Sequence, residues 1–469
     1  MIARAGLVAC AMLAAASRPA AAHAFAQRYD LPLPLWHYLV GAGAAVAVSF
    51  VVVARATTRV QHLPSPSIAI PTAFAAAIAG ILRLCGLCAF AILLAAGIFG
   101  EQGDWDSNLL PVAVWVLWWV GLTFVCALVG DVWALVDPWR GGARLAARAT
   151  APRLRLPDRL GAWPAVVLFF AFSWAELVWP ENAVPRKLAA AIALYSTLAW
   201  LGMALFGAAA WREHCDPFVR FFGLFARFAP LAATRRDGRV FIALRPFGAG
   251  LAGTEPASPS AAAFILLALA TVGFDGIAET PLWEAIVGEA MGALYAIGVV
   301  GAFGYVVAGG LVKTIGLITA PLLFAAVYGA TCAMTGRIVG ESAGLVARRF
   351  VLSLVPIAIA YHLSHYTSYL LIQGQAALPL LADPFALGWD LLGTRAREVD
   401  VGIVDMRTVW FGMILAIVLG HVASVVLAHR EAQRAYGALA MRSQIPMIVL
   451  MIAYTMLSLW ILSQPIVSV

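Results

Sequence analysis

The chain has 469 residues, of which 63% are hydrophobic and 12% are charged, and its formal net charge is +7. Soluble domains carry roughly 25% charged residues, so this composition excludes an ordinary soluble globular protein. The apolar runs are continuous, which also excludes an outer-membrane barrel whose strands alternate apolar and polar residues. The sequence therefore predicts an all-α fold, a polytopic transmembrane helix bundle in a lipid bilayer. The basic residues fall in a few loops, as in membrane proteins generally, so no nucleic-acid partner is expected.

The N-terminal stretch has the features of a secretory signal peptide. A basic residue, an apolar core and a run of small residues follow one another in the order typical of such signals. Residues 1–22 are therefore predicted to be a signal peptide, with cleavage after Ala22 or, equally well, after Ala24. An uncleaved first helix is the alternative. Residues 23–469 are predicted to form a single transmembrane helical domain.

About eleven apolar runs follow the signal, each long enough to cross a bilayer as a helix of roughly 20 residues. The predicted spans are 36–54, 76–100, 110–135, 163–180, 188–211, 261–280, 288–309, 312–335, 350–372, 407–428 and 446–466.

Loop charge predicts how these spans are oriented. The basic loops 136–162 and 212–260 fall in the cytoplasm if the mature N-terminus lies in the periplasm, which places the chain in a bacterial inner membrane. The basic residues of the C-terminal third reach the same side only if one of the three spans within 261–335 does not cross fully. We expect the glycine-rich run 288–309 to be broken or re-entrant, because irregular backbone survives in a membrane only when it is buried in protein or lines a cavity.

Two loops are predicted to be more than connectors. Residues 216–230 (DPFVRFFGLFARFAP) interleave aromatic residues with arginine, which predicts an amphipathic helix on the cytoplasmic face, within the basic loop 212–260. Residues 374–405 form a long, acidic periplasmic loop. This loop is either a lid over a site below it or a solvated connector.

Two histidines lie within the apolar run 350–372. His362 and His365 are three residues apart and share one helix face, and Tyr361 and Tyr366 lie on the same turns. Ionisable groups at membrane depth are costly and usually face the interior of a bundle or a wet cavity. This helix is therefore the first candidate for a functional site.

Imidazole and carboxylate groups from separate spans suggest a metal site. The predicted topology places His362, His365 and Asp275 in the outer half of the bundle, and His37 lies at the outer end of the first span. Such ligands suit Zn²⁺ or a similar divalent metal ion, which can lower the pKa of a bound water to about 7. Glu176, toward the outer end of another span, is a further catalytic candidate. Alternatively, the two paired histidines only pack and hydrogen-bond to neighbouring helices.

A second polar layer is predicted near the cytoplasmic face. Its members include Asp131, Asp137, Asp216 and His421, of which Asp131 and His421 are candidates for an inner gate or a proton relay. The tryptophans near span ends and within apolar runs, such as Trp118, are explained by the membrane interface and by packing, without a ligand.

Four stretches resemble a family of bacterial polytopic membrane proteins labelled fenitrothion hydrolase. They are HAFAQRYDLPLPLW at 23–36, DPFVRFFGLFARFAP at 216–230, FDGIAETPLW at 274–283 and YHLSHYTSYLLIQGQ at 361–375. The similarity is one of order and character over most of the chain. The resemblance implies a membrane-bound hydrolase of organophosphorus triesters that acts with a partner subunit.

Three functions are compatible with these residues. As a hydrolase, the chain takes an apolar small-molecule substrate from the bilayer, and a metal-bound hydroxide at the histidine–Asp275 site attacks phosphorus. The metal or a tyrosine, Tyr361 or Tyr366, stabilises charge on the phosphoryl oxygen while an aryl oxide leaves. As a transporter or proton-coupled permease, the chain uses the same buried charges for transport. As a periplasm-facing copper-handling protein, it requires signal cleavage to expose His23 as a ligand.

Overall fold

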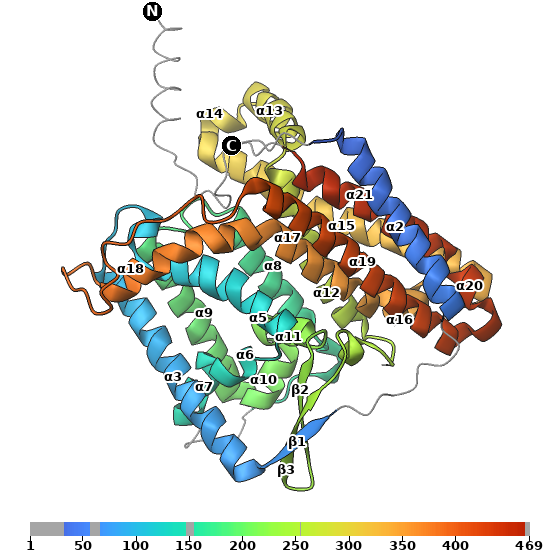
Figure 1. Cartoon of the computed structure of the whole chain (residues 1–469). Coiled ribbons are helices and arrows are strands. Elements are labelled where there is room, and N and C mark those ends of the chain that lie inside the picture. The colour runs from blue at the N-terminus through green and yellow to red at the C-terminus, as the bar shows by residue number, and fades with distance from the viewer. Residues whose placement is uncertain (1–31, 57–65, 147–153, 254, 465–469) are drawn as a thin grey trace, which may run out of the picture.

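The computed structural model describes residues 32–56, 66–146, 154–253 and 255–464. Most of the described chain is helical (Figure 1), which confirms the predicted all-α bundle. Nine helices in the described ranges are long and apolar enough to cross a membrane, fewer than the eleven predicted. They are Leu35–Arg55, Thr72–Phe99, Leu109–Leu128, Pro185–Phe206, Pro259–Ala278, Tyr305–Val339, Ala343–Ala382, Met406–Ser443 and Ile445–Leu462. The predicted signal peptide (1–22) and the start of the mature chain, with His23, lie outside the described residues.

The helices follow one another through the bundle, with longer connections between α11 and α12 and between α18 and α19. The N-terminal half contains α2 (Leu35–Ala56), α3 (Thr72–Phe99), α4 (Leu109–Pro111), the π-helical segment η2 (Val112–Gly121), α5 (Leu122–Leu128), α6 (Trp133–Val136), α7 (Pro138–Ala146), α8 (Trp163–Leu177), α9 (Pro185–Phe206), α10 (Ala208–His214) and α11 (Pro217–Ala226). The C-terminal half contains α12 (Pro259–Ala278), α13 (Pro281–Ala296), α14 (Val299–Phe303), α15 (Tyr305–Val339), α16 (Ala343–Phe350), α17 (Val355–Gln373), α18 (Ala377–Ala382), α19 (Met406–Tyr436), α20 (Ala440–Ser443) and α21 (Ile445–Leu462).

Two of the predicted spans differ from the structure. The span predicted at 163–180 is α8, which has 15 residues and is shorter than a full crossing. The span predicted at 288–309 is not one helix, because Gly298 and Gly304, at φ of 82° and 83°, separate α13, α14 and α15. Such positive φ values favour glycine. The break predicted from the glycine run is therefore present, and α13 and α14 project from one end of the molecule (Figure 1).

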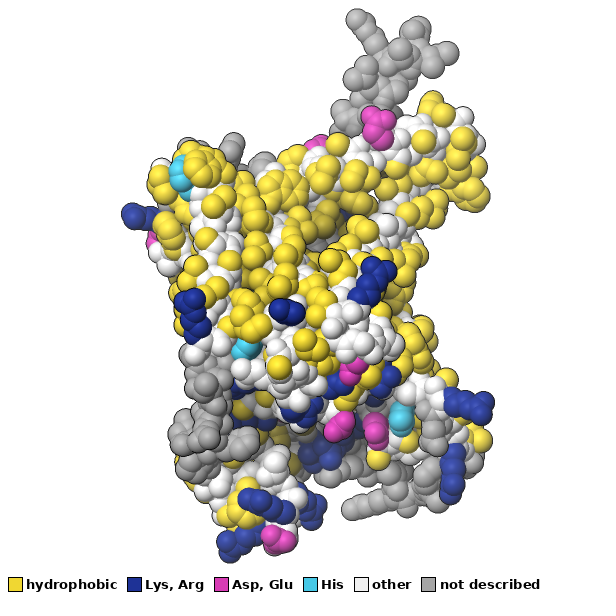
Figure 2. All heavy atoms as spheres, turned by 90° about the vertical axis from the view of Figure 1, so that its right-hand side faces the viewer, with side chains coloured by type: hydrophobic (Ala, Val, Ile, Leu, Met, Phe, Trp, Pro, Cys, Tyr) yellow, Lys and Arg dark blue, Asp and Glu magenta, His cyan; other side chains and the backbone are white. Residues whose placement is uncertain are grey.

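Because residues 288–309 do not form a full crossing, the basic segments meet at one end of the bundle. Arg348 Nε donates to the Ala257 carbonyl over 2.7 Å, and Arg349 forms an ion pair with Glu431 at 3.6 Å. These contacts join the segment before α12, the segment before α17 and the last part of α19. Figure 2 shows Lys and Arg side chains gathered in the lower part of one face, below a mainly hydrophobic area. We call this the arginine-bearing end.

A small antiparallel sheet also lies at the arginine-bearing end. It contains β1 (Ser67–Pro71), β2 (Leu231–Arg236) and β3 (Arg239–Leu244) in the order β1-β3-β2. Asp237 and Gly238, both with positive φ, form the two-residue turn between β2 and β3. An Asp-Gly pair between two short apolar runs is a hairpin signal, and it was present in the predicted loop 212–260.

The predicted surface helix at 216–230 lies inside the protein, so its predicted location is wrong. The Asp216 carboxylate caps α11 by accepting from the Phe218 and Val219 amides, both at 3.0 Å. The helix has four phenylalanines at positions i, i+3, i+4 and i+7, which place them on one face. That face packs against protein, because its residues are at most 4% exposed: Phe218, Phe221, Phe222 and Phe225.

The predicted periplasmic loop 374–405 starts with a 3-10 turn (Gly374–Ala376) and α18, and it continues without regular structure to α19. Its two ends are tied together, since the Gln375 side chain donates to the Asp400 carbonyl over 3.0 Å and accepts from the Asp400 amide over 3.1 Å. Most residues between them are exposed. This loop lies close to the α3–α4 connection, because the Pro384 carbonyl approaches Gly100.

Candidate functional site

Helix α17, which carries the predicted histidines, lies at the centre of the bundle. Its residues are buried on nearly every side, so protein surrounds it instead of lipid. Its contact with α19 is so close that a Cβ atom added at Gly420 would lie 2.2 Å from Ala360 Cβ. The centre of the bundle therefore holds the side chains of α17 in fixed surroundings.

Asp275 on α12 and two residues of α17 form one hydrogen-bonded unit. His365 Nε2 lies 2.9 Å from Asp275 Oδ2, and the Tyr366 hydroxyl donates to the same oxygen over 2.6 Å. All three side chains are buried. A carboxylate that accepts from two donors in a buried site is fixed in orientation and strongly bonded. The structure thus brings together His365 and Asp275, which are 90 residues apart in sequence.

The Tyr361 hydroxyl lies beside this Asp275–His365–Tyr366 unit. A Cβ atom at Gly276 would be only 2.3 Å from Tyr361 Oη, so a glycine is needed next to Asp275 for this approach. The hydroxyl is buried and has no hydrogen-bond partner within the part of the chain that the structure describes. A donor is therefore available close to the Asp275 carboxylate.

His362 faces a different environment from His365. Its ring makes edge-to-face contacts with Trp119 at 6.1 Å, Phe124 at 5.8 Å and Tyr366 at 4.7 Å between centroids. Neither ring nitrogen has a hydrogen-bond partner among the residues described. His362 is therefore enclosed by aromatic rings and does not bond to Asp275.

Two titratable groups from other helices lie near Asp275. One is the predicted Glu176 on α8, which also lies beside Trp119. The other is Lys313 on α15, which sequence analysis missed. A lysine inside an apolar run of a predicted span was the signal that could have identified it.

The structure does not place His37 with this group. His37 is exposed on α2, where its ring stacks on Trp36 at 3.6 Å and its Nδ1 lies 3.2 Å from the Pro34 carbonyl. Its position near the first turn of a peripheral helix keeps it at the surface and accounts for these local contacts.

The residues as placed do not fit the predicted metal site. Over the described ranges, no three His, Cys, Asp or Glu side chains are grouped so that they could hold a metal ion. His365 Nε2 is bonded to Asp275, and the His362 ring is enclosed by aromatic side chains. A zinc site needs at least three protein ligands that converge on one point. The divalent metal therefore stays a prediction that this arrangement does not support.

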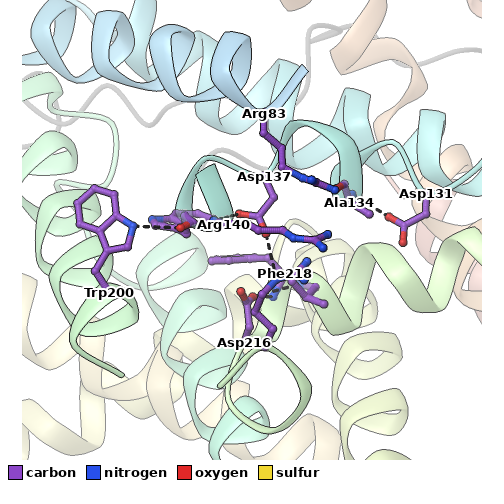
Figure 3. A network of polar contacts seen from close by, with 11 residues as sticks. Arg83, Asp131, Ala134, Asp137, Arg140, Trp200, Asp216 and Phe218 are labelled. Carbon is purple, nitrogen blue, oxygen red and sulfur yellow. Dashed lines mark hydrogen bonds and ion pairs between the residues drawn. The ribbon is translucent and has the colours of Figure 1, made fainter. Parts of the chain in front are cut away.

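A second buried polar cluster lies at the arginine-bearing end, where Asp131, Asp137 and Asp216 gather with arginines (Figure 3). Asp137 is fully buried, accepts from the Arg140 amide over 3.1 Å and lies 3.3 Å from Arg212 Nε. Asp131 accepts from the Ala134 amide over 3.1 Å. This cluster therefore holds the turns that join α5, α6 and α7 to the start of α11. The predicted gate residue His421 is elsewhere, with Nδ1 2.8 Å from the Ile417 carbonyl of its own helix.

Burial dominates the electrostatics of this second cluster. It raises the pKa of the Asp216 carboxyl to about 7, with a further contribution from Asp137, while the amides of α11 act in the opposite direction. Burial also raises the pKa of the Asp137 carboxyl, which Arg212 partly offsets. Both carboxyls are consequently easier to protonate in the folded state than in the unfolded chain.

An apolar cavity of about 870 Å³ lies between α3, η2, α8 and α9. None of the described residues that line it is charged. Phe172 lines the cavity and contacts Trp119 at 4.6 Å, and Trp119 in turn contacts His362. A layer of aromatic side chains thus separates this cavity from the Asp275–His365–Tyr366 unit. Local sequence patterns do not predict this cavity, because its walls come from several separate helices.

Comparisons of this chain with protein-family models, with curated proteins and with solved structures find no match.

Proposed function

We propose that this chain is an integral membrane hydrolase of apolar organophosphorus triesters. The observation that carries the proposal is the buried Asp275–His365–Tyr366 unit inside a bundle of apolar helices. Titratable groups at such depth are costly and indicate function. The resemblance to fenitrothion hydrolases supports the substrate class, since two of the similar stretches contain Asp275 and His365.

In the proposed reaction, Asp275 acts as the general base, and His365 and Tyr366 hold its carboxylate in position. Asp275 takes the proton from a water molecule as the water oxygen forms a bond to phosphorus. The bond between phosphorus and the aryl oxygen breaks, and the aryl oxide leaves with the electron pair. The Tyr361 hydroxyl donates to the phosphoryl oxygen as negative charge develops there. Glu176 is another carboxylate near this position and an alternative proton acceptor.

The test is release of nitrophenol from 4-nitrophenyl diethyl phosphate by detergent-purified protein. We expect Asp275→Asn to lower the rate by at least about 100-fold, because a general base contributes that much or more. His37→Gln is the matched control, since His37 is exposed and should leave the rate unchanged. A wild-type protein that releases no nitrophenol contradicts the proposal.

A second candidate function, proton-coupled transport, rests on a separate observation. Asp275, Glu176 and Lys313 belong to three different helices and lie within electrostatic range in the apolar bundle, as charges do in carriers. Uptake of a labelled triester into proteoliposomes, driven by a pH gradient and lost in Lys313→Met, would favour it. Turnover without uptake would favour hydrolysis.

The predicted metal has its own test. Metal content is compared between wild-type protein and the His362→Ala/His365→Ala variant, both purified without chelator. If the variant contains one equivalent of Zn²⁺ less than the wild-type protein, the result would support the metal-assisted mechanism. Equal content would leave the Asp275 reaction as proposed.

We further propose that the protein lies in a bacterial inner membrane with its signal peptide removed, its mature N-terminus in the periplasm and a partner subunit beside it. The basic segments at one end support this orientation, because cytoplasmic loops carry the excess of arginine. Labelling of Asp106→Cys from the periplasm and of Asp237→Cys only after permeabilisation is the expected result. The reverse pattern contradicts the orientation. Co-purification of a second chain from the native membrane tests the partner.

A further inference from the structure

Residues 384–392 of the long acidic loop form a turn that presents large apolar side chains to the outside. We call it the leucine–tryptophan turn. Scattered apolar residues are ordinary at a protein surface, but four large ones close together form a patch that indicates an interaction. The four are Leu387, Trp389, Leu391 and Leu392, which are 64%, 43%, 65% and 57% exposed.

Hydrogen bonds hold the backbone of this turn in place. The buried Asp383 carboxylate accepts from the Leu387 amide over 2.9 Å and from the Gly388 amide over 2.8 Å. The Leu391 amide donates over 3.0 Å to the carbonyl of Ala382, the last residue of α18. The apolar side chains therefore project from a turn that is fixed to the end of α18.

The leucine–tryptophan turn lies beside the end of helix α3 that is remote from the arginine-bearing end. α3 begins at the small sheet, where the Thr72 amide donates to the Gly238 carbonyl over 3.3 Å, and it ends at Phe99. A Cβ atom added at Gly100, the next residue, would lie 3.2 Å from the Pro384 carbonyl oxygen (Figure 1). With 28 residues, α3 is about 42 Å long, which matches the roughly 40–45 Å of a bilayer with its headgroups. The turn therefore lies at the depth of lipid headgroups.

The outer face of α3 already requires lipid as its partner. Apolar side chains recur on this face at intervals of two or three helical turns, so they form one row along the helix. The row consists of Phe74, Ile81, Ile92 and Phe99, which are 58%, 63%, 50% and 76% exposed. The leucine–tryptophan turn adjoins the end of this row, so its apolar surface continues a surface that faces lipid.

We propose that the leucine–tryptophan turn inserts into the headgroup region of the adjoining leaflet and anchors the loop 374–405 to the bilayer. The leucines reach the first carbons of the acyl chains, and the Trp389 indole takes the interfacial position that tryptophan prefers. Asp390 is the one charged residue within 384–392, and its carboxylate accepts from the Arg395 amide over 3.1 Å. The anchor does not depend on the proposed hydrolase.

A fluorescent label at a single cysteine tests the insertion in phosphatidylcholine liposomes. The cysteines outside the buried core are first replaced by alanine: Cys10, Cys85 and Cys88. The label is attached to Leu391→Cys, and Asp104→Cys in the exposed α3–α4 connection is the matched control. We expect a lipid with a nitroxide near its headgroup to quench the Leu391 label. Iodide on both sides of the membrane should quench this label at least about fivefold less than the Asp104 label, because an anion enters apolar surroundings at high cost.

Two results of this experiment would overturn the anchor. Equal quenching of both labels by iodide would mean that the turn lies in water. Protection of the Leu391 label from iodide without quenching by the nitroxide lipid would mean that protein covers the turn, either a second copy or another chain.

Proteolysis provides a second measurement without a label. Trypsin cleaves after Arg395 and Arg397, which closely follow the turn. In liposomes, we expect Leu387→Asp/Leu391→Asp to be cleaved there about tenfold faster than the wild-type protein, because cleavage follows the population of the released loop. Leu387→Met/Leu391→Met is the matched control and should keep the wild-type rate. Equal rates for the aspartate variant and the wild-type protein would overturn the anchor, whereas nitrophenol release bears only on the hydrolase.

Discussion

The two buried carboxylate clusters differ in the groups that bind the carboxylate and hold it away from water. At Asp275, one carboxylate oxygen accepts from His365 and Tyr366, both side chains of a neighbouring apolar helix. At Asp137, the carboxylate pairs with Arg212 and accepts a backbone amide at the start of α7. The first arrangement joins two long helices through titratable side chains, whereas the second fixes the turns between helices. The comparison suggests a functional role for Asp275 and a structural role for Asp137.

The largest effect on stability is expected at Asp137. Asp137→Ala should lower the free energy of unfolding by about 3–5 kcal/mol, because it leaves the Arg212 guanidinium without its buried partner. Unfolding in mixed micelles at increasing denaturant measures this change. The control is Glu181→Ala, which breaks the exposed ion pair with Lys187 and should cost less than about 1 kcal/mol. If both variants lose the same free energy of unfolding, Asp137 does not have the structural role described here.

The second effect is a dependence on pH that comes from Asp216. Its pKa of about 7 in the folded state lies above the unfolded value of roughly 3.9, so its contribution to stability is complete below about pH 4 and is lost as the pH rises through 7. The unfolding free energy should therefore fall between pH 5 and pH 8 by on the order of 2–3 kcal/mol. Melting temperatures measured across this window check the slope.

Asp216→Asn separates this titration from the capping of α11. Asparagine also accepts from the amides of Phe218 and Val219, so the helix cap is retained. The variant should show a flatter profile, with a residual slope from Asp137, whose pKa burial also raises. Superimposable profiles for the two proteins would exclude Asp216 as the titrating group.

The hydrogen bond between Tyr366 and Asp275 should have a smaller effect on stability. Tyr366→Phe is expected to cost about 1–2 kcal/mol, since hydrogen bonds between helices in apolar surroundings rarely contribute more. A double-mutant cycle with Asp275→Asn should return a coupling energy of about 1 kcal/mol. A coupling near zero would mean that the two groups do not depend on each other.

Residue spacing and loop charge together predicted that His365 and Asp275 lie close to each other. The i, i+3 spacing of His362 and His365, together with the predicted topology, placed His365 near Asp275, and the structure joins them. The same reasoning placed 216–230 on a surface, which is wrong. An apolar helix face does not reveal whether protein or lipid covers it, because both are equally apolar. The face of Phe218 and Phe221 is covered by protein.

The remaining differences depend on contacts between distant segments. The cavity takes its walls from α3, η2, α8 and α9, and no local pattern specifies how such helices are spaced. Trp118, which the sequence analysis explained by packing or by the membrane interface, lines this cavity. Lys313 was recognisable as a charge within an apolar run, but only the packing of α15 against α12 brings it near Asp275. Sequence periodicity identified the buried faces, and the tertiary fold determined their partners.

The smallest effect, and the sharpest test of the two histidines, is expected for His362→Phe. The ring is buried among Trp119, Phe124 and Tyr366, and neither nitrogen has a partner in the described structure. Phenylalanine has a similar shape and removes two unpaired polar atoms, so stability should change by less than about 1 kcal/mol in either direction. His365→Phe should cost more, because it breaks the bond to Asp275. Unfolding free energies, metal content and nitrophenol release are compared for the two variants. If both lose metal and activity equally, the two imidazoles act together as ligands and the aromatic enclosure of His362 opens in the working protein.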